Sequence, residues 1–320
     1  MTCITTNDVF FSRIIKSILT ATVASLAFST SVHADNQASA LSGLIQPAQF
    51  VEDNGSSERI DFSGKLRMLS QRIVAASCYL QAGVETQASR DTLAAATTEF
   101  ALITDALEFG NPDLGIIGVE EHRKTLAGIA KLRELWGPIS VLADKVEAGD
   151  GSVADITAIA DQSAPLLEIA QRLVVQITGQ YASQTSVLQS DAIAIDLAGR
   201  QRMLAQRISK NICLIASGVN VEASSADLVA TDEIFRNTLY ALRFGLPGAG
   251  IQQAKNNDIA DGLTVVARNM ETLSPLIAEI AAGRTLDPGQ LGVAFLTANL
   301  MTGNMNRAVG LISEASKLSL

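Results

Sequence analysis

The side chains best suited to bind a ligand lie in a short motif that occurs twice in the chain. The first copy reads Gly64-Lys65-Leu66-Arg67-Met68-Leu69-Ser70-Gln71-Arg72, and the second reads Gly199-Arg200-Gln201-Arg202-Met203-Leu204-Ala205-Gln206-Arg207. Each copy therefore holds a guanidinium close to a glycine and to an amide. Because guanidinium groups are planar and forked, they suit small planar oxyanions and carboxylates.

Helical periodicity places the glycine, the first arginine and the glutamine of each motif on one stripe. This stripe contains Ile60, Gly64, Arg67, Gln71, Val74 and Cys78 in the first copy, and Ile195, Gly199, Arg202, Gln206, Ser209 and Cys213 in the second. A neighbouring apolar stripe, from Phe62 to Leu80, is expected to face the core of its own copy. Glycine inside a helix costs roughly 1 kcal/mol relative to alanine, so its use in both copies indicates close approach by another backbone.

We expect the two motif helices to pair in parallel across a pseudo-twofold axis. The two glycines would let them approach, and Arg67 and Arg202 would lie on the same seam. Two guanidiniums at one level repel, and an anion between them would accept hydrogen bonds from both. Gln71 and Gln206 lie one turn further on and could add donors. The alternative is that each arginine binds carboxylates of neighbouring helices.

A third stripe carries charges for which salt bridges are the expected role. It holds Arg72 and Arg207, together with Asp61, Asp196 and their i+4 neighbours Lys65 and Arg200. Charges on exposed helix faces usually pair along a helix or between helices. We therefore expect these residues to support the site rather than to bind the ligand.

Cys78 and Cys213 occupy equivalent positions, so parallel pairing would place them opposite each other. In an exported protein they would meet an oxidising compartment. The sequence leaves two interpretations open, a disulfide between the copies or a pair of buried small apolar residues.

The composition argues against several other functions. The net charge of −9 repels phosphate backbones, so we expect no nucleic-acid partner. Beyond the first 34 residues His122 is the one histidine, and with two cysteines it cannot build a structural zinc site. No serine or cysteine nucleophile can be matched with a base, and no glycine-rich phosphate loop is present. We expect no enzyme, no metal and no cofactor.

The elements that must position the motif read as helices throughout. In the first copy we expect helices over 58–81 and 90–107, a third from Val119 that is broken or kinked at Gly137-Pro138, and a fourth from Val153. The second copy follows the same plan, so the fold class is all-α, with two tandem four-helix bundles related by internal duplication (57–188 and 189–320). The bundles can pack side by side, or stack end to end if the helices either side of the boundary are continuous.

The N-terminus reads as an export signal over residues 1–34, followed by a flexible segment over 35–56. Arg13 and Lys16 precede a short apolar stretch, and Val32-His33-Ala34 offers a cleavage site. We therefore expect a periplasmic protein, with an uncleaved membrane anchor as the alternative.

The motif resembles the first-helix segment of the PilJ-like family, the N-terminal periplasmic domain of type IV pilus methyl-accepting chemotaxis transducers. It is also similar to the ligand-binding segment of nitrate and nitrite sensor kinases of the NarX/NarQ type. Both likenesses rest on Gly-x-x-Arg-Met-Leu-x-Gln-Arg at 64–72 and 199–207. They extend from about Glu58 to the C-terminus and imply a four-helix sensory bundle.

The resemblance also implies roles for single residues. In the nitrate sensors the arginine before the motif methionine binds nitrate between the first helices of two subunits, a role that falls on Arg67 and Arg202. The Leu-x-Gln-Arg ending is closer to the pilus transducers. Asp61 and Asp196 stand where the nitrate sensors usually have asparagine, and each carboxylate would oppose an anion unless a cation at i+4 neutralises it.

Together these features predict a periplasmic ligand-binding sensory module. It would bind a small anion such as nitrate or nitrite between paired arginines and signal through a membrane receptor or transporter, and a homodimer would form the site if the bundles stack end to end. The alternative is a ligand-free protein–protein interaction module of a chemosensory or type IV pilus-related system.

Overall fold

The computed structural model describes residues 55–181 and 189–317, and each copy of the repeat contributes four α-helices. The first copy forms α2 (Ser56–Gln81), α3 (Thr86–Phe109), α4 (Arg123–Ala148) and α5 (Val153–Tyr181); the second forms α6 (Gln189–Ala216), α7 (Val221–Phe244), α8 (Asn257–Ala281) and α9 (Pro288–Lys317). Within these residues there are isolated β-bridges but no strand. The predicted all-α, duplicated architecture is confirmed. The predicted export signal over 1–34 lies outside the described residues, as does segment 35–56 apart from its last two residues.

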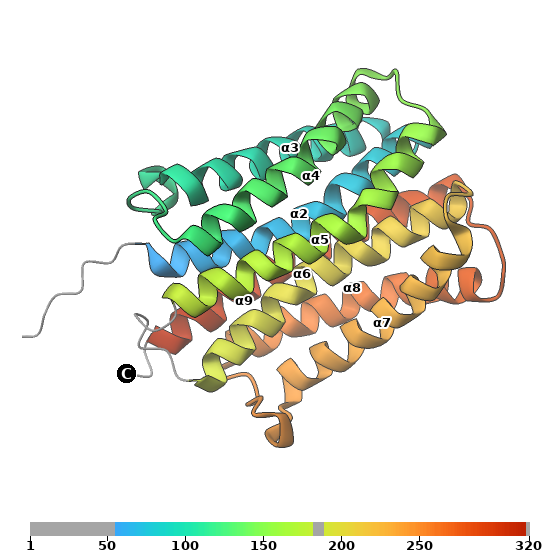
Figure 1. Cartoon of the computed structure of the whole chain (residues 1–320). Coiled ribbons are helices and arrows are strands. Elements are labelled where there is room, and N and C mark those ends of the chain that lie inside the picture. The colour runs from blue at the N-terminus through green and yellow to red at the C-terminus, as the bar shows by residue number, and fades with distance from the viewer. Residues whose placement is uncertain (1–54, 182–188, 318–320) are drawn as a thin grey trace, which may run out of the picture. The chain divides into compact units, whose positions relative to one another are not determined.

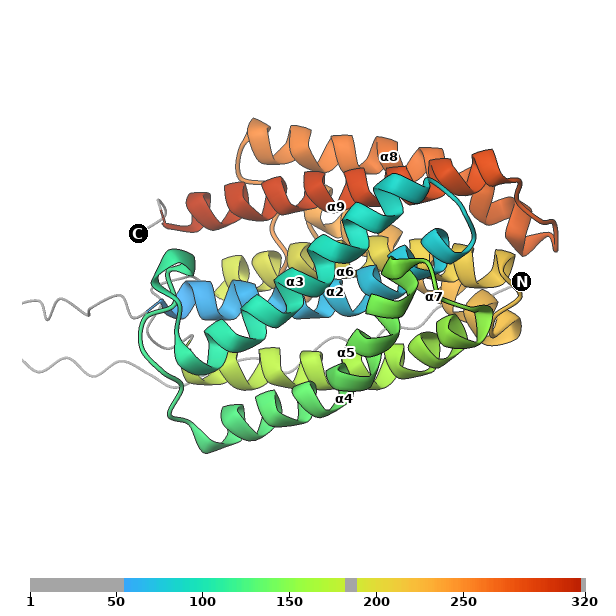
Figure 2. The same ribbon diagram turned by 90° about the horizontal axis from the view of Figure 1, so that it is seen from above.

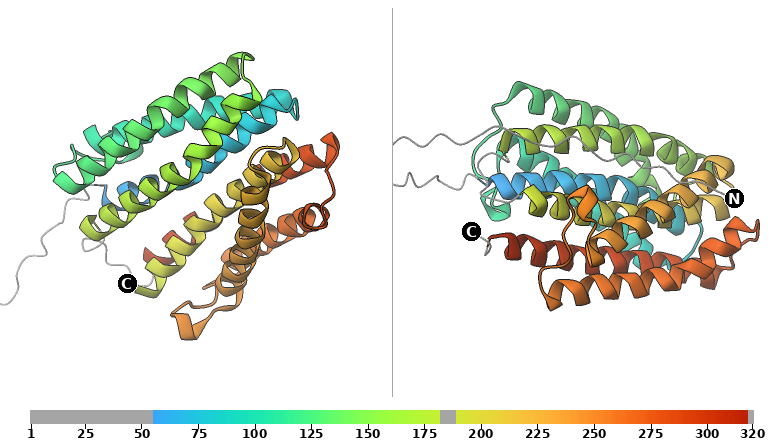
Figure 3. Two further views of the ribbon diagram at one scale, coloured as in Figure 1. Left: turned by 45° about the vertical axis from the view of Figure 1, so that its right-hand side comes forward. Right: turned by 90° about the horizontal axis from the view of Figure 1, so that it is seen from below.

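The two copies lie side by side along α2 and α6, so the end-to-end alternative is wrong. In each view α2 and α6 are neighbours (Figures 1 and 3), with α3 and α4 on one side of the pair and α7 and α8 on the other (Figure 1). The remaining long helices complete the centre, because α5 packs on α2 and α9 packs on α6 (Figure 2). The motif helices thus form the middle of the molecule.

The sequence of α2 explains this central position. Leu66, Leu69 and Ile73 are fully buried in the core of the first copy, while Arg67 and Gln71 are buried along the seam with α6. A helix that is buried on both faces must have neighbours on both sides. The apolar stripe and the glycine-arginine stripe therefore have different partners, as their separate periodicities predict.

The turns repeat in detail between the copies. Gly83 and Gly218 both have φ near 70° just after the motif helix, where left-handed backbone favours glycine. The turn after the second helix of each copy is closed by one isolated antiparallel β-bridge, between Asn111 and Ile116 in the first copy and between Leu246 and Ile251 in the second. The duplication therefore includes backbone geometry as well as sequence.

The third helix differs from its prediction at its start and at its proline. α4 begins at Arg123 rather than near Val119, because buried Glu120 accepts hydrogen bonds from the backbone of His122 and from the hydroxyl of Tyr181 and holds the preceding residues in a loop. The helix also continues through Pro138 to Ala148, so of the two predicted outcomes, a break or a kink, the break is excluded. A proline removes one ladder hydrogen bond, and buried residues on both sides of it, such as Ile139, keep the helix packed.

Across the described ranges, no helix combines the length and the apolar character that a bilayer crossing requires.

Candidate functional site

Arg67 and Arg202 lie together at the seam between α2 and α6, and each binds the other copy. The Nη2 atom of Arg67 donates to Oδ1 of Asp196 over 3.2 Å, and Nη2 of Arg202 donates to Oδ1 of Asp61 over 3.0 Å. Both arginines are only 3% exposed, whereas the two aspartates lie at the surface end of each pair, 38% and 43% exposed. The result is a reciprocal pair of salt bridges that crosses between the copies.

The same arginines are also fixed to the fourth helix of their own copy. Nη1 of Arg67 donates to Gln171 on α5 over 2.9 Å, and Nη1 of Arg202 donates to Asn306 on α9 over 2.7 Å. Each guanidinium therefore joins three helices. Gln171 and Asn306 were not predicted as site residues, although the sequence signal was present: both are amides at positions that match under the same offset as the motif.

The motif glycines leave room for the guanidiniums rather than for a neighbouring backbone. A Cβ atom on Gly64 would lie 3.5 Å from Nη2 of Arg67 and 3.9 Å from Nη2 of Arg202. One on Gly199 would lie 3.5 Å from Nη2 of Arg202 and 3.8 Å from Nη2 of Arg67. The expectation of close backbone contact at the glycines is therefore wrong in its detail. Both guanidiniums lie next to the same small volume, which a larger side chain would take from them.

The charges around this point do not cancel completely. Asp196 also accepts from Arg200 at 2.8 Å, so Arg67, Arg200 and Arg202 face two carboxylates. Burial lowers the pKa of Arg67, Asp196 raises it, and the neighbouring arginines lower it further. An excess of positive charge therefore remains at the seam, although each guanidinium already has a carboxylate partner.

The cations expected to neutralise the aspartates behave differently in the two copies. Arg200 binds Asp196 at i−4, as its spacing predicts. Lys65 does not bind Asp61; it lies 3.7 Å from Glu99 on α3 and above the ring of Phe62. Asp61 is free to cross to α6 and bind Arg202 instead, because Lys65 has partners within its own copy.

Gln71 and Gln206 do not extend the arginine site. Gln71 donates to Ser70 and accepts from Ser163 on α5, while Gln206 donates to Thr302 on α9 over 2.8 Å. Since both amides are used to bind the fourth helix of their own copy, they are not additional donors to an anion between the arginines.

Arg72 and Arg207 occupy unlike surroundings despite their equivalent positions. Arg207 forms a bidentate salt bridge with Asp227 on α7. Arg72 has no such partner: its Nε atom is buried without a hydrogen bond among the described residues, and burial lowers its pKa while Glu99 raises it. The expected interhelical salt bridge is present only in the second copy, because Thr92 stands in the first copy where Asp227 stands in the second.

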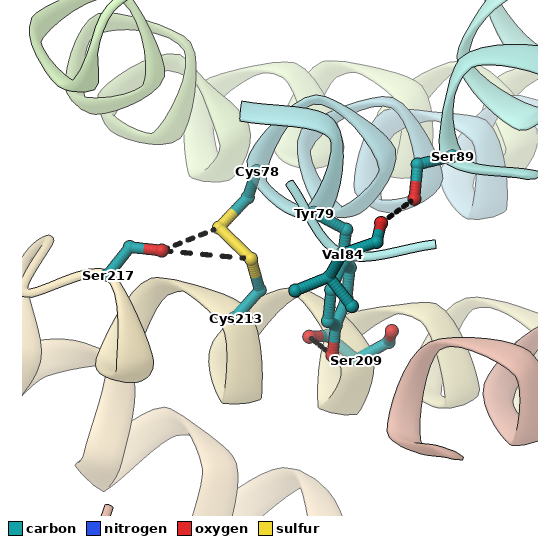
Figure 4. The surroundings of a disulfide bond; sticks show 7 residues. All are labelled: Cys78, Tyr79, Val84, Ser89, Ser209, Cys213 and Ser217. Atoms are coloured by element: carbon teal, nitrogen blue, oxygen red, sulfur yellow. Dashed lines mark hydrogen bonds between the residues drawn. A yellow bond between two sulfur atoms is a disulfide. The ribbon is translucent and has the colours of Figure 1, made fainter. Parts of the chain in front are cut away.

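A disulfide joins Cys78 to Cys213 further along the same seam, with 6.1 Å between the two Cα atoms. It links equivalent residues of the two copies, and Ser217 Oγ lies 3.5 Å from the sulfur of Cys78 and 3.9 Å from that of Cys213 (Figure 4). Of the two interpretations open from the sequence, the structure contains the covalent one. The seam is thus closed by ionic contacts in the first half of α2 and by a covalent bond near its end.

The structure is a pair of helical bundles joined along their first helices, with buried arginines at the joint. Residues 50–161 and 184–292 match the family described as the N-terminal domain of type IV pili methyl-accepting chemotaxis transducers. The chain belongs to this family, in two tandem copies.

The chain also matches a curated protein over about two thirds of its own length. The chain is 25% identical over 220 residues to a putative methyl-accepting chemotaxis protein, AlkN, of Alcanivorax borkumensis. The match covers 67% of this chain and 29% of that relative. The chain is therefore a sensing and signalling module of a chemotaxis-transducer family, and it spans less than a third of the length of this relative.

Proposed function

We propose that this module senses a small oxyanion, such as nitrate or nitrite, that binds to Arg67 and Arg202. The observation that carries the proposal is the proximity of the two guanidiniums, whose Nη2 atoms both lie within 4 Å of the Cβ position of Gly64 and of Gly199. A planar oxyanion can accept hydrogen bonds from two such groups at once. The excess positive charge of Arg200 adds to the attraction.

Asp61 and Asp196 define how binding would proceed. They act as internal anions that occupy the guanidiniums when no ligand is present, and their own side chains are partly exposed. An incoming oxyanion replaces one or both carboxylates, which then turn to solvent. Because each aspartate belongs to the opposite copy, this exchange removes the ionic contacts between α2 and α6.

Replacement of the aspartates by an oxyanion would loosen the contact between α2 and α6 at one end of the seam only. The disulfide between Cys78 and Cys213 holds the other end of the two helices, so the first turns of α2 and α6 become free to separate or to rotate. A partner that contacts both copies can detect such a change. We place this function in the periplasm, with a membrane receptor or transporter as the partner, in line with the expected export signal and with the family.

Calorimetry tests the site. Nitrate titrated into the full chain should give saturable heat that disappears in an Arg67→Ala, Arg202→Ala double variant. The matched control is Arg172→Ala with Arg236→Ala, which removes two exposed arginines that pair along their own helices. Unchanged nitrate binding in the first double variant, or no saturable heat from nitrate, nitrite or formate in the unmodified chain, would reject the anion site.

A ligand-free interaction module is the second candidate, and two observations favour it. Both arginines already have carboxylate partners. In addition, α9 carries an exposed apolar stripe of Val293, Leu296 and Leu300, 43%, 47% and 56% exposed. The equivalent positions on α5 are Ala158, Asp161 and Pro165. Apolar stripes of this kind often mark a protein contact.

The two candidate functions should be lost in different variants. Leu296→Asp with Leu300→Asp should abolish co-sedimentation with the native membranes if α9 is the contact surface, and it should leave nitrate heats unchanged. Analytical ultracentrifugation of the same variant reports whether the stripe instead joins two copies of the chain. Retention of membrane binding and of mass in this variant would exclude the stripe as an interface.

A further inference from the structure

A cavity lies at the end of the α2–α6 seam, away from the arginines. Its volume is about 320 Å³, which is at the lower end of the range for small-molecule sites. Ala82 and Ala216 line it and are exposed, so the cavity opens to solvent. Cys78 lines it as well, so the disulfide forms part of its wall. We call this cavity the disulfide pocket.

Both copies of the repeat build the disulfide pocket from equivalent positions. Its lining includes the equivalent pairs Gln81 and Ala216, Ala82 and Ser217, and Ile156 and Leu291. These residues come from the ends of α2 and α6 and from the starts of α5 and α9. The disulfide pocket therefore lies on the pseudo-twofold axis, and neither copy alone would form it.

The lining has a definite chemical character. Val153, Ile156, Val219 and Leu291 supply apolar walls, while Gln81 and Ser217 supply the hydrogen-bonding side chains. No charged residue lines the cavity. A charged ligand would lose its hydration here without gaining a counter-charge, whereas an apolar one gains by leaving water.

We propose that the disulfide pocket binds a small uncharged molecule that is mostly apolar and carries one hydrogen-bonding group. The apolar part contacts the walls from both copies, and the polar group binds Ser217 or Gln81. Because the ligand touches both motif helices, its binding free energy depends on how the two helix ends are placed. The ligand thus contacts both copies directly beside the disulfide that joins them.

This site is separate from the arginine site and does not rest on it. Cys78 follows Arg67 by three turns of α2, which corresponds to ~16 Å along the helix at 1.5 Å per residue. The two sites also differ in the ligand charge they require, because the arginine site would bind an anion and the disulfide pocket an uncharged molecule. Removal of the arginine pair should therefore leave binding in the disulfide pocket intact.

Cyclohexanol is a suitable probe, because it is uncharged, compact and carries one hydroxyl. Added to the oxidised full chain, it should shift the methyl NMR signals of Ile156, Val219 and Leu291 in a saturable way. Ala216→Phe, at an exposed position on the rim, should abolish these shifts without disturbing the fold. Ala95→Phe, at an exposed position on α3, is the matched control and should leave them unchanged.

Two further comparisons define the chemistry. Ser217→Ala together with Gln81→Leu should weaken cyclohexanol binding several-fold while leaving cyclohexane binding unchanged, because only the alcohol uses the hydrogen bond. Cyclohexanecarboxylate should bind far more weakly than the alcohol. The proposal is overturned if cyclohexanol causes no saturable shifts at these methyl groups, if Ala216→Phe leaves its binding intact, or if the carboxylate binds equally well.

Discussion

The motif helices α2 and α6 agree along the seam and differ on the faces that pack within their own copies. Glycine, arginine, glutamine and cysteine occur at equivalent seam positions of both helices. Away from the seam, Leu66 and Ala76 of the first copy are replaced by Gln201 and Asn211 in the second. The seam is constrained because each helix must fit its twin, whereas each core needs to fit only its own bundle.

The largest effect should come from separating the copies at the disulfide. Cys78→Ala with Cys213→Ala opens a loop of 135 residues, and the chain-entropy account gives a loss of about 4–5 kcal/mol in the free energy of unfolding. Urea unfolding of the double variant measures it. A loss below ~1 kcal/mol would mean that packing alone holds α2 against α6.

A smaller effect should follow from exchanging a core residue between the copies. Gln201 is fully buried, and neither atom of its amide has a hydrogen-bond partner among the described residues, whereas its equivalent Leu66 packs in the core. Gln201→Leu should therefore raise the free energy of unfolding by about 1–3 kcal/mol, and Leu66→Gln should lower it by at least as much.

Thermal or urea unfolding of both single variants measures this asymmetry. A destabilising Gln201→Leu change would show that the amide has a bound water or ligand as its partner. That outcome would make the core of the second copy a binding site of its own, and the two cores would then differ in function as well as in packing.

The third comparison concerns Lys210, where the first copy has Ala75. Burial lowers the pKa of Lys210 to about 8, while Asp227 raises it and Arg207 lowers it. Ser163 of the first copy lies 3.4 Å from its Nζ atom. The folded pKa is below the unfolded value, so the unfolded chain binds more protons between the two values, and stability rises with pH through that window.

Lys210→Met should therefore stabilise the fold near neutral pH by about 1–3 kcal/mol, and the gain should shrink as the pH approaches the usual lysine pKa. Urea unfolding of the variant and of the unmodified chain, at neutral pH and again near the usual lysine pKa, measures how the gain changes with pH. Lys131→Met, at an exposed position that pairs with Glu134, is the control and should show no such trend. An equal effect of Lys210→Met at both pH values would contradict a desolvated lysine.

Much of the fold follows from the sequence because repetition and periodicity are local signals. The stripes of α2 predicted its two buried faces, and the repeat predicted Arg67 opposite Arg202. The partners of these arginines could not be predicted, since the choice of Asp196 and Asp61 depends on how the helices are rotated against each other. Lys65 illustrates the same limit, because its i+4 spacing from Asp61 did not show that Glu99 was nearer.

The start of α4 and the disulfide pocket could not be predicted from the sequence for a different reason. The loop before Arg123 is fixed by buried Glu120, whose contact with Tyr181 joins residues far apart in the chain. The disulfide pocket depends on four helix ends that meet only after both copies have packed. Neither feature has a periodic signature.

The central claim is that the arginine pair accepts a small anion in place of the two aspartates, and one variant tests it directly. Asp61→Ala with Asp196→Ala leaves two buried guanidiniums without carboxylates, which should destabilise the fold by several kcal/mol. Nitrate should then raise the unfolding temperature of this variant far more than chloride at equal ionic strength, and more than it does for the unmodified chain. Equal shifts with nitrate and chloride would contradict the account.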